Sequence, residues 1–149
     1  KGGWFEEHIY SVVKSLPGIQ DVAMGMQIDN STTKQTDGTN ELDVVFTYNN
    51  RLHVIECKTV NYQSAHNKGE DKKELDRLVA LKQSGGSAAK ALFASYKKLD
   101  SDVRARAKDK NIEIIEQNDL NGLKARLKTW IGIQDPVPAP RPEVDEPTS

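Results

Sequence analysis

NELDVVFTYNNRLHVIECKT, residues 40–59, consists of two apolar runs separated by a pair of asparagines. Runs rich in Val, Ile, Phe and Tyr favour β-strands. Asparagine tolerates the positive φ angle that a tight hairpin turn requires. The segment therefore predicts two antiparallel strands, about Glu41 to Tyr48 and Arg51 to Lys58, joined by a turn at Asn49-Asn50.

The turn also sets which residues face one another across the hairpin. With the two asparagines at the tip, Asp43 lies opposite Glu56, and Glu41 lies opposite Lys58. Because side chains alternate between the two faces of a strand, these four polar side chains emerge on one face, at the open end of the hairpin. The opposite face is apolar and predicts a core layer of Val44, Phe46, Ile55 and Cys57.

Two opposed carboxylates on a half-buried sheet predict a bound cation. Facing Cβ atoms lie about 4.5–5.5 Å apart, where like charges repel, and burial makes both charges costly unless a positive group lies between them. Ligand sets made only of oxygen favour Mg2+ or Mn2+ over Zn2+. The candidate metal ligands are Asp43, Glu56 and the backbone carbonyl of Cys57. Lys58, on the same face, would orient the attacking water or bind a phosphate, whereas an isolated Glu-x-Lys triplet is usually a solvated surface pair.

The rest of the chain alternates between helical patterns and short apolar runs. Helices are predicted at residues 3–16, 70–83 and 100–110, and from Asp119 onwards. Further strands are predicted at residues 22–28, 91–96 and 112–115, with a polar loop at 29–39 that contains the turn signal Asp37-Gly38. This order predicts an α/β fold with a mixed central sheet flanked by helices on both sides.

The composition predicts one domain with a tail. Residues 2–133 form the expected domain. Residues 134–149 are interpreted as a proline-rich acidic linker or disordered tail, because five prolines and five charges leave little apolar surface to bury. The first residue is Lys1 rather than Met, which fits an excised piece of a longer protein with a regulatory domain outside this chain.

Cysteine content, hydropathy and charge exclude several classes of protein. The single cysteine, Cys57, excludes a disulfide framework and a cysteine-based zinc site, and it fits a reducing, cytoplasmic setting. No apolar run approaches the ~20 residues that span a bilayer, and no signal-peptide pattern opens the chain. The net charge of −1 counts against strong independent phosphate binding, but acidic active-site ligands leave a nuclease compatible with it.

Three motifs carry a family resemblance: GGWFEE at residues 2–7, NELDVVF at residues 40–46 and VIECKT at residues 54–59. Together they resemble the nuclease domain of the CARF-linked, cyclic-oligoadenylate-activated effectors of type III CRISPR systems, within the PD-(D/E)xK, restriction-endonuclease-like group. The likeness covers most of residues 2–127. It implies a homodimeric nuclease in which Asp43 is the metal-binding acid of the first motif and Glu56 and Lys58 form the second.

The same resemblance implies a glutamate on the first helix, at Glu6 or Glu7. On a helical wheel Glu6 flanks the apolar stripe, whereas Glu7 lies almost opposite it. Glu6 is therefore the candidate for an additional catalytic and metal-binding residue. Alternatively, Glu6 has no role in catalysis and is an acidic residue in the first helical turn, where the helix dipole favours negative charge. Glu41 is either a second partner of Lys58 or a flanking surface charge.

The resulting hypothesis is phosphodiester hydrolysis by water activated with Mg2+ or Mn2+. DNA is the preferred substrate over RNA, and low sequence specificity is expected because no sequence-reading motif is present. The alternatives are a nuclease fold that has lost activity and docks nucleic acid or protein, and a restriction or repair endonuclease of the same fold. Trp4 and Trp130 are expected to pack their helices rather than stack on bases, and His53 is expected to face away from the carboxylates.

Overall fold

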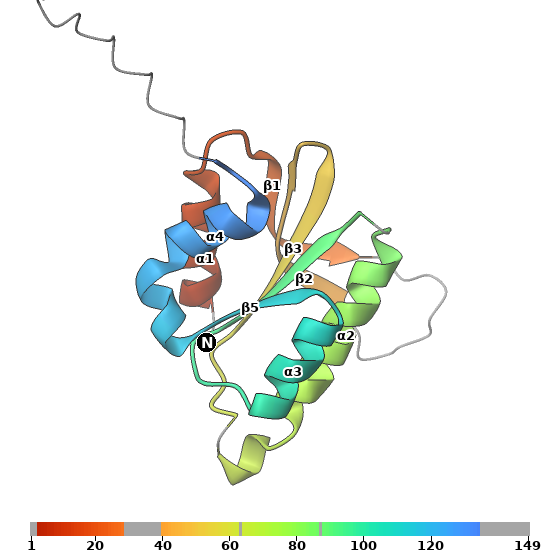
Figure 1. The fold of residues 1–149 in the computed structure, drawn as a ribbon, viewed down its shortest axis with the longest axis vertical. Helices are drawn as coiled ribbons and strands as arrows, with labels where there is room; N and C mark the ends of the chain where they lie inside the picture. The colour runs from red at the N-terminus through yellow and green to blue at the C-terminus, as the bar shows by residue number, and fades with distance from the viewer. Residues whose placement is uncertain (1–2, 29–39, 63, 87, 135–149) are drawn as a thin grey trace, which may run out of the picture.

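The computed structural model describes residues 3–28, 40–62, 64–86 and 88–134. Within these ranges, five strands form one sheet in the order β1-β2-β3-β4-β5. The strands are β1 Gln20–Ile28, β2 Asn40–Tyr48, β3 Arg51–Lys58, β4 Lys90–Ser95 and β5 Ile112–Glu116. β1, β2 and β3 run antiparallel, whereas β3, β4 and β5 run parallel, so the predicted mixed sheet is confirmed (Figure 1).

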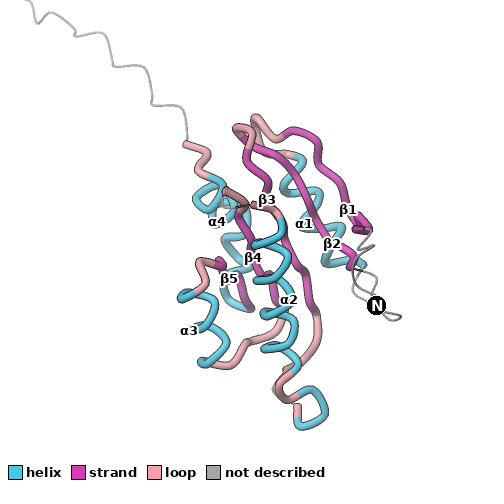
Figure 2. Tube along the Cα trace, turned by 90° about the vertical axis from the view of Figure 1, so that its right-hand side faces the viewer, coloured by secondary structure: helices cyan, strands magenta, loops and turns pink. Residues whose placement is uncertain are grey.

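Helices cover both faces of this sheet, as the sequence predicts (Figure 2). α1 Gly3–Lys14 and α4 Leu123–Ile131 pack on one face, and α2 Glu70–Ser84 and α3 Ser101–Asp109 pack on the other. Two short 3-10 turns, η1 Ala65–Asn67 and η2 Gln117–Gly122, precede α2 and α4. None of these helices is long and apolar enough to cross a membrane.

Each face of the sheet contributes its own core because side chains alternate along the strands. Beneath α1 and α4 the core includes the predicted layer of Val44, Phe46, Ile55 and Cys57. Beneath α2 and α3 it includes Val45, Val54, Leu75, Leu78 and Phe93. β3, in the middle of the sheet, is thus buried on both faces, and any polar side chain near its end becomes buried with it.

The hairpin turn between β2 and β3 has the predicted chemistry. Asn49 and Asn50 both adopt positive φ, at 50° and 61°, which is the geometry of a tight hairpin turn. The paired residues of the two strands include Tyr48 with Arg51, in the predicted register. The turn therefore fixes which side chains of the hairpin face each helical layer.

At its open end the hairpin departs from the prediction. Pairing between β2 and β3 ends at Val44–Ile55, one pair before Asp43 and Glu56, so neither these acids nor the residues beyond them are ladder partners. Beyond that point β2 stays paired only with β1, and β3 stays paired only with β4 through Lys58. The two strands separate because each keeps its other neighbour. The separation opens the sheet at the acidic residues.

Some element boundaries also differ from those predicted. α1 ends at Lys14, two residues early, and the final helix begins at Leu123 rather than near Asp119. The Asp119 carboxylate accepts a hydrogen bond from the Glu116 backbone N–H at 3.1 Å, which forms part of a reciprocal cap on η2. This cap stabilises a 3-10 turn in place of the first helical turn. The predicted polar loop at 29–39 and most of the predicted tail lie outside the described residues.

Candidate active site

The predicted site residues come together where β2 and β3 separate. Asp43 projects from β2, and Glu56 and Lys58 project from β3. Glu6 reaches the same place from the first turn of α1. The other helical layer contributes Glu74 from α2, which contacts Lys58. Four elements, α1, β2, β3 and α2, therefore supply titratable groups to one end of the sheet.

Asp43 bridges the gap between the two strands. Its side chain is 7% exposed, and its Oδ2 atom accepts a hydrogen bond from the backbone N–H of Cys57 at 2.8 Å. This bond satisfies an amide that has lost its partner on β2. Burial raises the pKa of Asp43, although the Cys57 N–H and the Lys58 charge partly oppose that rise.

Glu56 is the more deeply buried acid, with 3% of the residue exposed. Its Oε1 atom lies 3.2 Å from Lys58 Nζ and 3.7 Å from Arg77 Nη1. Its Oε2 atom is buried and has no hydrogen-bond partner among the described residues. Burial, followed by the charge of Asp43, raises the pKa of Glu56 to about 8. A further positive charge, placed at Oε2, would stabilise the ionised carboxylate against both burial and the charge of Asp43.

Lys58 is held between two carboxylates. Its ammonium nitrogen contacts Glu56 at 3.2 Å and Glu74 at 3.6 Å, and Arg77 contacts Glu74 at 3.5 Å from the next turn of α2. Burial acts to lower the pKa of Lys58, but the Glu56 and Glu74 carboxylates outweigh it and raise the pKa. The ammonium group is therefore fixed in position and stays charged at neutral pH.

Glu74 and Arg77 were not predicted from the sequence, which offered Glu41 either as a second partner of Lys58 or as a flanking surface charge. Instead, the Glu41 backbone carbonyl accepts a hydrogen bond from Arg77 at 3.0 Å. The Glu41 side chain lies over Gly25 of β1, where an added Cβ would be 3.1 Å from its Oε1 atom. Helical periodicity was the available signal, because Glu74 lies three residues after the buried Asp71 and four before the buried Leu78 and so shares their face of α2.

The structure also distinguishes the two glutamates of α1. Glu6 is half-buried, whereas Glu7 is exposed. Burial, followed by the negative charges of Asp43 and Glu41, raises the pKa of Glu6. Glu6 thus lies in the electrostatic field of Asp43, as the helical wheel predicts, and Glu7 points into solvent.

A cavity of about 280 Å3 adjoins Lys58 on the α2 side of the sheet. Its other lining residues are Val60, Tyr62, His66, Asn67, Glu70 and Glu74. The Tyr62 hydroxyl is buried with no hydrogen-bond partner among the described residues, so it is available to a ligand. Larger hollows, of about 690, 800 and 400 Å3, lie elsewhere on the domain, and none of the four predicted site residues lines them. The carboxylates, not cavity size, mark the candidate site.

The oxygen atoms at the site fit a divalent cation in part. Within the described ranges, no three His, Cys, Asp or Glu side chains already form a metal cage, because Asp43 Oδ2 is bonded to Cys57 and Glu56 Oε1 faces Lys58. The partnerless Glu56 Oε2 nevertheless fits a ligand oxygen. The nearby donors are carboxylate and backbone oxygens, which suit Mg2+ or Mn2+.

The sheet order and the position of the acidic hairpin define a restriction-endonuclease-like fold. The small subunit of the heterodimeric restriction endonuclease R.BspD6I has the same fold, with a TM-score of 0.55 and 20% identity over 85% of this chain and 69% of that subunit. A sequence model of one family within this class, described as the Card1-like endonuclease domain, matches residues 1–133. The chain belongs to that family.

Two solved structures are more similar in sequence. Can2 from Sulfobacillus thermosulfidooxidans, solved in complex with cyclic tetra-adenylate, has a TM-score of 0.73 and 32% identity over 87% of this chain and 36% of its own. Protein VC1899 from Vibrio cholerae has a TM-score of 0.75 and 33% identity over 88% of this chain and 34% of its own. The chain spans about a third of the length of each. No curated protein matches it significantly.

Proposed function

We propose that this domain hydrolyses phosphodiester bonds of DNA with a water molecule activated by Mg2+ or Mn2+, and with low sequence specificity. RNA is the alternative substrate. Membership of an endonuclease family supports hydrolysis of nucleic acid. Because the match covers 87% of this chain but only 36% of the longer Can2 chain, which was solved with cyclic tetra-adenylate, we also propose that this domain is the effector part of a larger, CRISPR-linked defence protein that acts as a dimer.

The observation that carries the proposal is the pair of buried acids beside a fixed lysine. Asp43 and Glu56 are 7% and 3% exposed, and both have a raised pKa. Such an arrangement is costly for folding when no cation is present, because burial and mutual repulsion both oppose ionisation. Carboxylates with strongly raised pKa values cluster at functional sites, which supports this assignment.

Each residue then has a distinct role. Asp43, Glu56 and the Cys57 backbone carbonyl would hold the metal ion, with Glu6 as a further carboxylate near Asp43. The bound ion would lower the pKa of water and offset negative charge that develops on the phosphate. Lys58 orients the attacking water or a phosphate oxygen, and Glu74 keeps its ammonium group in place.

Cleavage of supercoiled plasmid, single-stranded DNA and RNA, with Mg2+, Mn2+ or EDTA, tests this proposal. Asp43→Asn, Glu56→Gln and Lys58→Ala are each expected to slow cleavage at least about 100-fold. Glu6→Gln should also slow it, whereas the matched variant Glu7→Gln should cleave at the wild-type rate, because Glu7 is exposed. Unchanged cleavage rates in both Asp43→Asn and Lys58→Ala would contradict the assignment of these residues to the active site.

The substrate and assembly proposals have their own readouts. Comparison of initial rates on DNA and RNA of the same sequence decides between the two substrates, and analytical ultracentrifugation decides whether the chain is a dimer. Absence of cleavage with any metal, also in a full-length protein supplied with a cyclic oligoadenylate, would favour a docking module instead of an enzyme.

A further inference from the structure

The cavity beside Lys58 is lined by a buried hydroxyl that the described part of the domain does not use. Tyr62 is 2% exposed and lines this cavity, and its hydroxyl has no hydrogen-bond partner among the described residues. Burial, followed by the negative charges of Glu74 and Asp71, raises the pKa of Tyr62, so the hydroxyl stays protonated at neutral pH. Because a buried hydroxyl without a partner destabilises a fold, such a donor beside an active site indicates a contact with a ligand.

Two other side chains that line the cavity offer hydrogen-bond acceptors. The Asn67 side-chain NH2 group donates to the Asn61 carbonyl at 3.2 Å and to Ser64 Oγ at 3.1 Å. Both of its hydrogens are thus used, and its carbonyl oxygen, Oδ1, is the atom that it can offer to a ligand. The Glu70 carboxylate contacts Lys73 through Oε1 at 3.3 Å, and its Oε2 atom is the second acceptor. The cavity therefore combines one buried donor with two acceptors.

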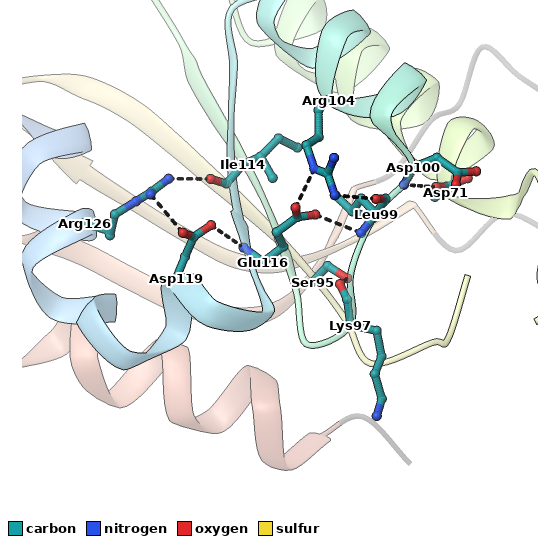
Figure 3. A network of polar contacts seen from close by, with 10 residues as sticks. All are labelled: Asp71, Ser95, Lys97, Leu99, Asp100, Arg104, Ile114, Glu116, Asp119 and Arg126. Atoms are coloured by element: carbon teal, nitrogen blue, oxygen red, sulfur yellow. Dashed lines mark hydrogen bonds and ion pairs between the residues drawn. The ribbon is translucent and has the colours of Figure 1, made fainter. Parts of the chain in front are cut away.

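Hydrogen bonds within the domain hold the walls of this cavity in place. On one side, the Ser64 hydroxyl donates to the Asn61 carbonyl at 3.0 Å, which stabilises the turn around Tyr62. On the other side, Asp71 Oδ2 accepts a hydrogen bond from the Asp100 N–H at 3.3 Å, which ties the first turn of α2 to the start of α3 (Figure 3). Groups that are fixed in this way lose little conformational entropy when a ligand binds.

Size and charge limit what this cavity can hold. Its volume of about 280 Å3 lies just below the range of about 300–1,000 Å3 for small-molecule sites, which fits one nucleotide base rather than a whole nucleotide. The carboxylates of Glu70 and Glu74 line it together with the ammonium group of Lys58, so the cavity repels a phosphate and favours a neutral group. The base is the neutral part of a nucleotide. Because Lys58 also lines the cavity, a base bound there belongs to a nucleotide next to the phosphate at Lys58.

We infer that this cavity receives the base next to the scissile phosphate and prefers a base with an amino group beside an unprotonated ring nitrogen, as in cytosine and adenine. The amino group donates to Asn67 Oδ1 and to Glu70, and the ring nitrogen accepts a hydrogen bond from the Tyr62 hydroxyl. Thymine and uracil place a carbonyl oxygen where the amino group is needed, so that acceptors would face one another. The inference rests on the proposed nuclease function, because it names the base beside which the site cleaves.

Two bases of the same shape test this inference. 5-Methylcytosine differs from thymine only in the amino group and the unprotonated ring nitrogen, so a thymine-only DNA strand is compared with the same strand carrying one 5-methylcytosine; in RNA, cytosine is compared with uracil. Mapped cuts should give a kcat/KM about tenfold higher beside the substituted base. Tyr62→Phe, which removes only the hydroxyl, and Glu70→Ala should each bring this ratio close to that of two equivalent bases. Tyr48→Phe is the matched control and should keep the ratio, because Tyr48 ends β2 beside the hairpin turn and does not line the cavity.

Thermal unfolding shows whether the fold itself needs the hydroxyl. Because the Tyr62 hydroxyl has no partner among the described residues, Tm of Tyr62→Phe should equal or exceed that of wild type. A lower Tm would assign the hydroxyl to the fold and overturn the inference.

Failure of the base preference and failure of the nuclease proposal have different signatures. Cleavage that requires Asp43 but proceeds equally beside 5-methylcytosine and thymine would leave the nuclease proposal standing and reject only the base pocket. If neither strand is cleaved, fluorescence anisotropy with the same two strands decides. Tighter binding of the 5-methylcytosine strand, lost in Tyr62→Phe, would support the pocket without the nuclease, and equal binding of both strands would reject the pocket as well.

Discussion

The Cys57 backbone N–H donates a 2.8 Å hydrogen bond to the Asp43 carboxylate, at the point where β2 and β3 stop pairing. One side chain thus satisfies a strand amide and also supplies the acid proposed for metal binding. Such a carboxylate has a structural role and a chemical role, and substitutions that preserve only the first can separate them.

Asparagine and alanine at position 43 are expected to differ in stability but not in activity. Asp43→Asn keeps an acceptor for the Cys57 N–H and removes repulsion with Glu56, so the free energy of unfolding in EDTA should be equal to or above that of wild type. Asp43→Ala leaves the buried N–H without a partner, which costs about 1–3 kcal/mol. Urea unfolding measures the stability of each variant, and plasmid nicking measures its activity. Both variants should lose nicking activity. A destabilised Asp43→Asn would show that the negative charge itself stabilises the fold.

Divalent cations are expected to raise the thermal stability of the wild-type domain. A ligand that binds only the folded state adds about 2.7 kcal/mol at a concentration about 100 times its dissociation constant. In differential scanning fluorimetry with Mg2+ or Mn2+, Tm should therefore rise for wild type and stay constant for Glu56→Gln. A similar rise in the variant would place the bound cation elsewhere on the surface.

Glu74 is expected to act through Lys58. Replacement by Gln removes one of the two carboxylates that hold the ammonium group, and loss of such a positioning partner typically reduces activity about 10–100-fold. The effect should fall on kcat more than on KM, because Glu74 acts by holding the ammonium group of Lys58 and the fold stays intact. Asp76→Asn on the same helix is the matched control, since the Asp76 carboxylate pairs with Arg106 and does not line the cavity beside Lys58. Equal values of kcat and KM in the two variants would show that Glu74 does not position Lys58.

Local chemistry explains why the hairpin was predictable from the sequence. The turn conformation follows from Asn49 and Asn50, and alternation of side chains then assigns each residue to a face. The helical period of 3.6 residues separated the half-buried Glu6 from the exposed Glu7 on α1. These inferences need only neighbours in the sequence, and the packed structure agrees with them. The catalytic and metal-binding roles of the residues stay predictions.

What the sequence did not predict depends on packing between distant elements. The end of pairing at Val44–Ile55 is set by β1 and β4, which hold β2 and β3 apart. Glu74 reaches Lys58 only because α2 crosses that face of the sheet, and the exposed Trp4 ring meets Tyr96 only because α1 begins beside the end of β4. Periodicity indicates which face of an element is buried but not which other element lies against it.

His53 gives a test of the core through the pH dependence of stability. The ring is stacked on Phe46 with centroids 4.8 Å apart, and its Nδ1 atom lies 2.9 Å from the Arg51 carbonyl, so that nitrogen carries the hydrogen. Burial lowers the pKa of His53 to about 4 from its ordinary value of 6.5, although the Arg51 hydrogen bond opposes the change. The folded state therefore favours the neutral ring.

Because its folded pKa is depressed, the contribution of His53 to stability is complete above pH 6.5 and is lost as the pH falls through 4. With about 1.4 kcal/mol per pKa unit, wild type should lose about 3 kcal/mol more than His53→Phe between pH 7 and pH 4. Urea unfolding at a series of pH values measures this difference. His8→Gln, at an exposed position, should follow the wild-type curve. Parallel pH profiles for wild type and His53→Phe would mean that the buried ring accepts a proton as readily in the folded state as in the unfolded chain.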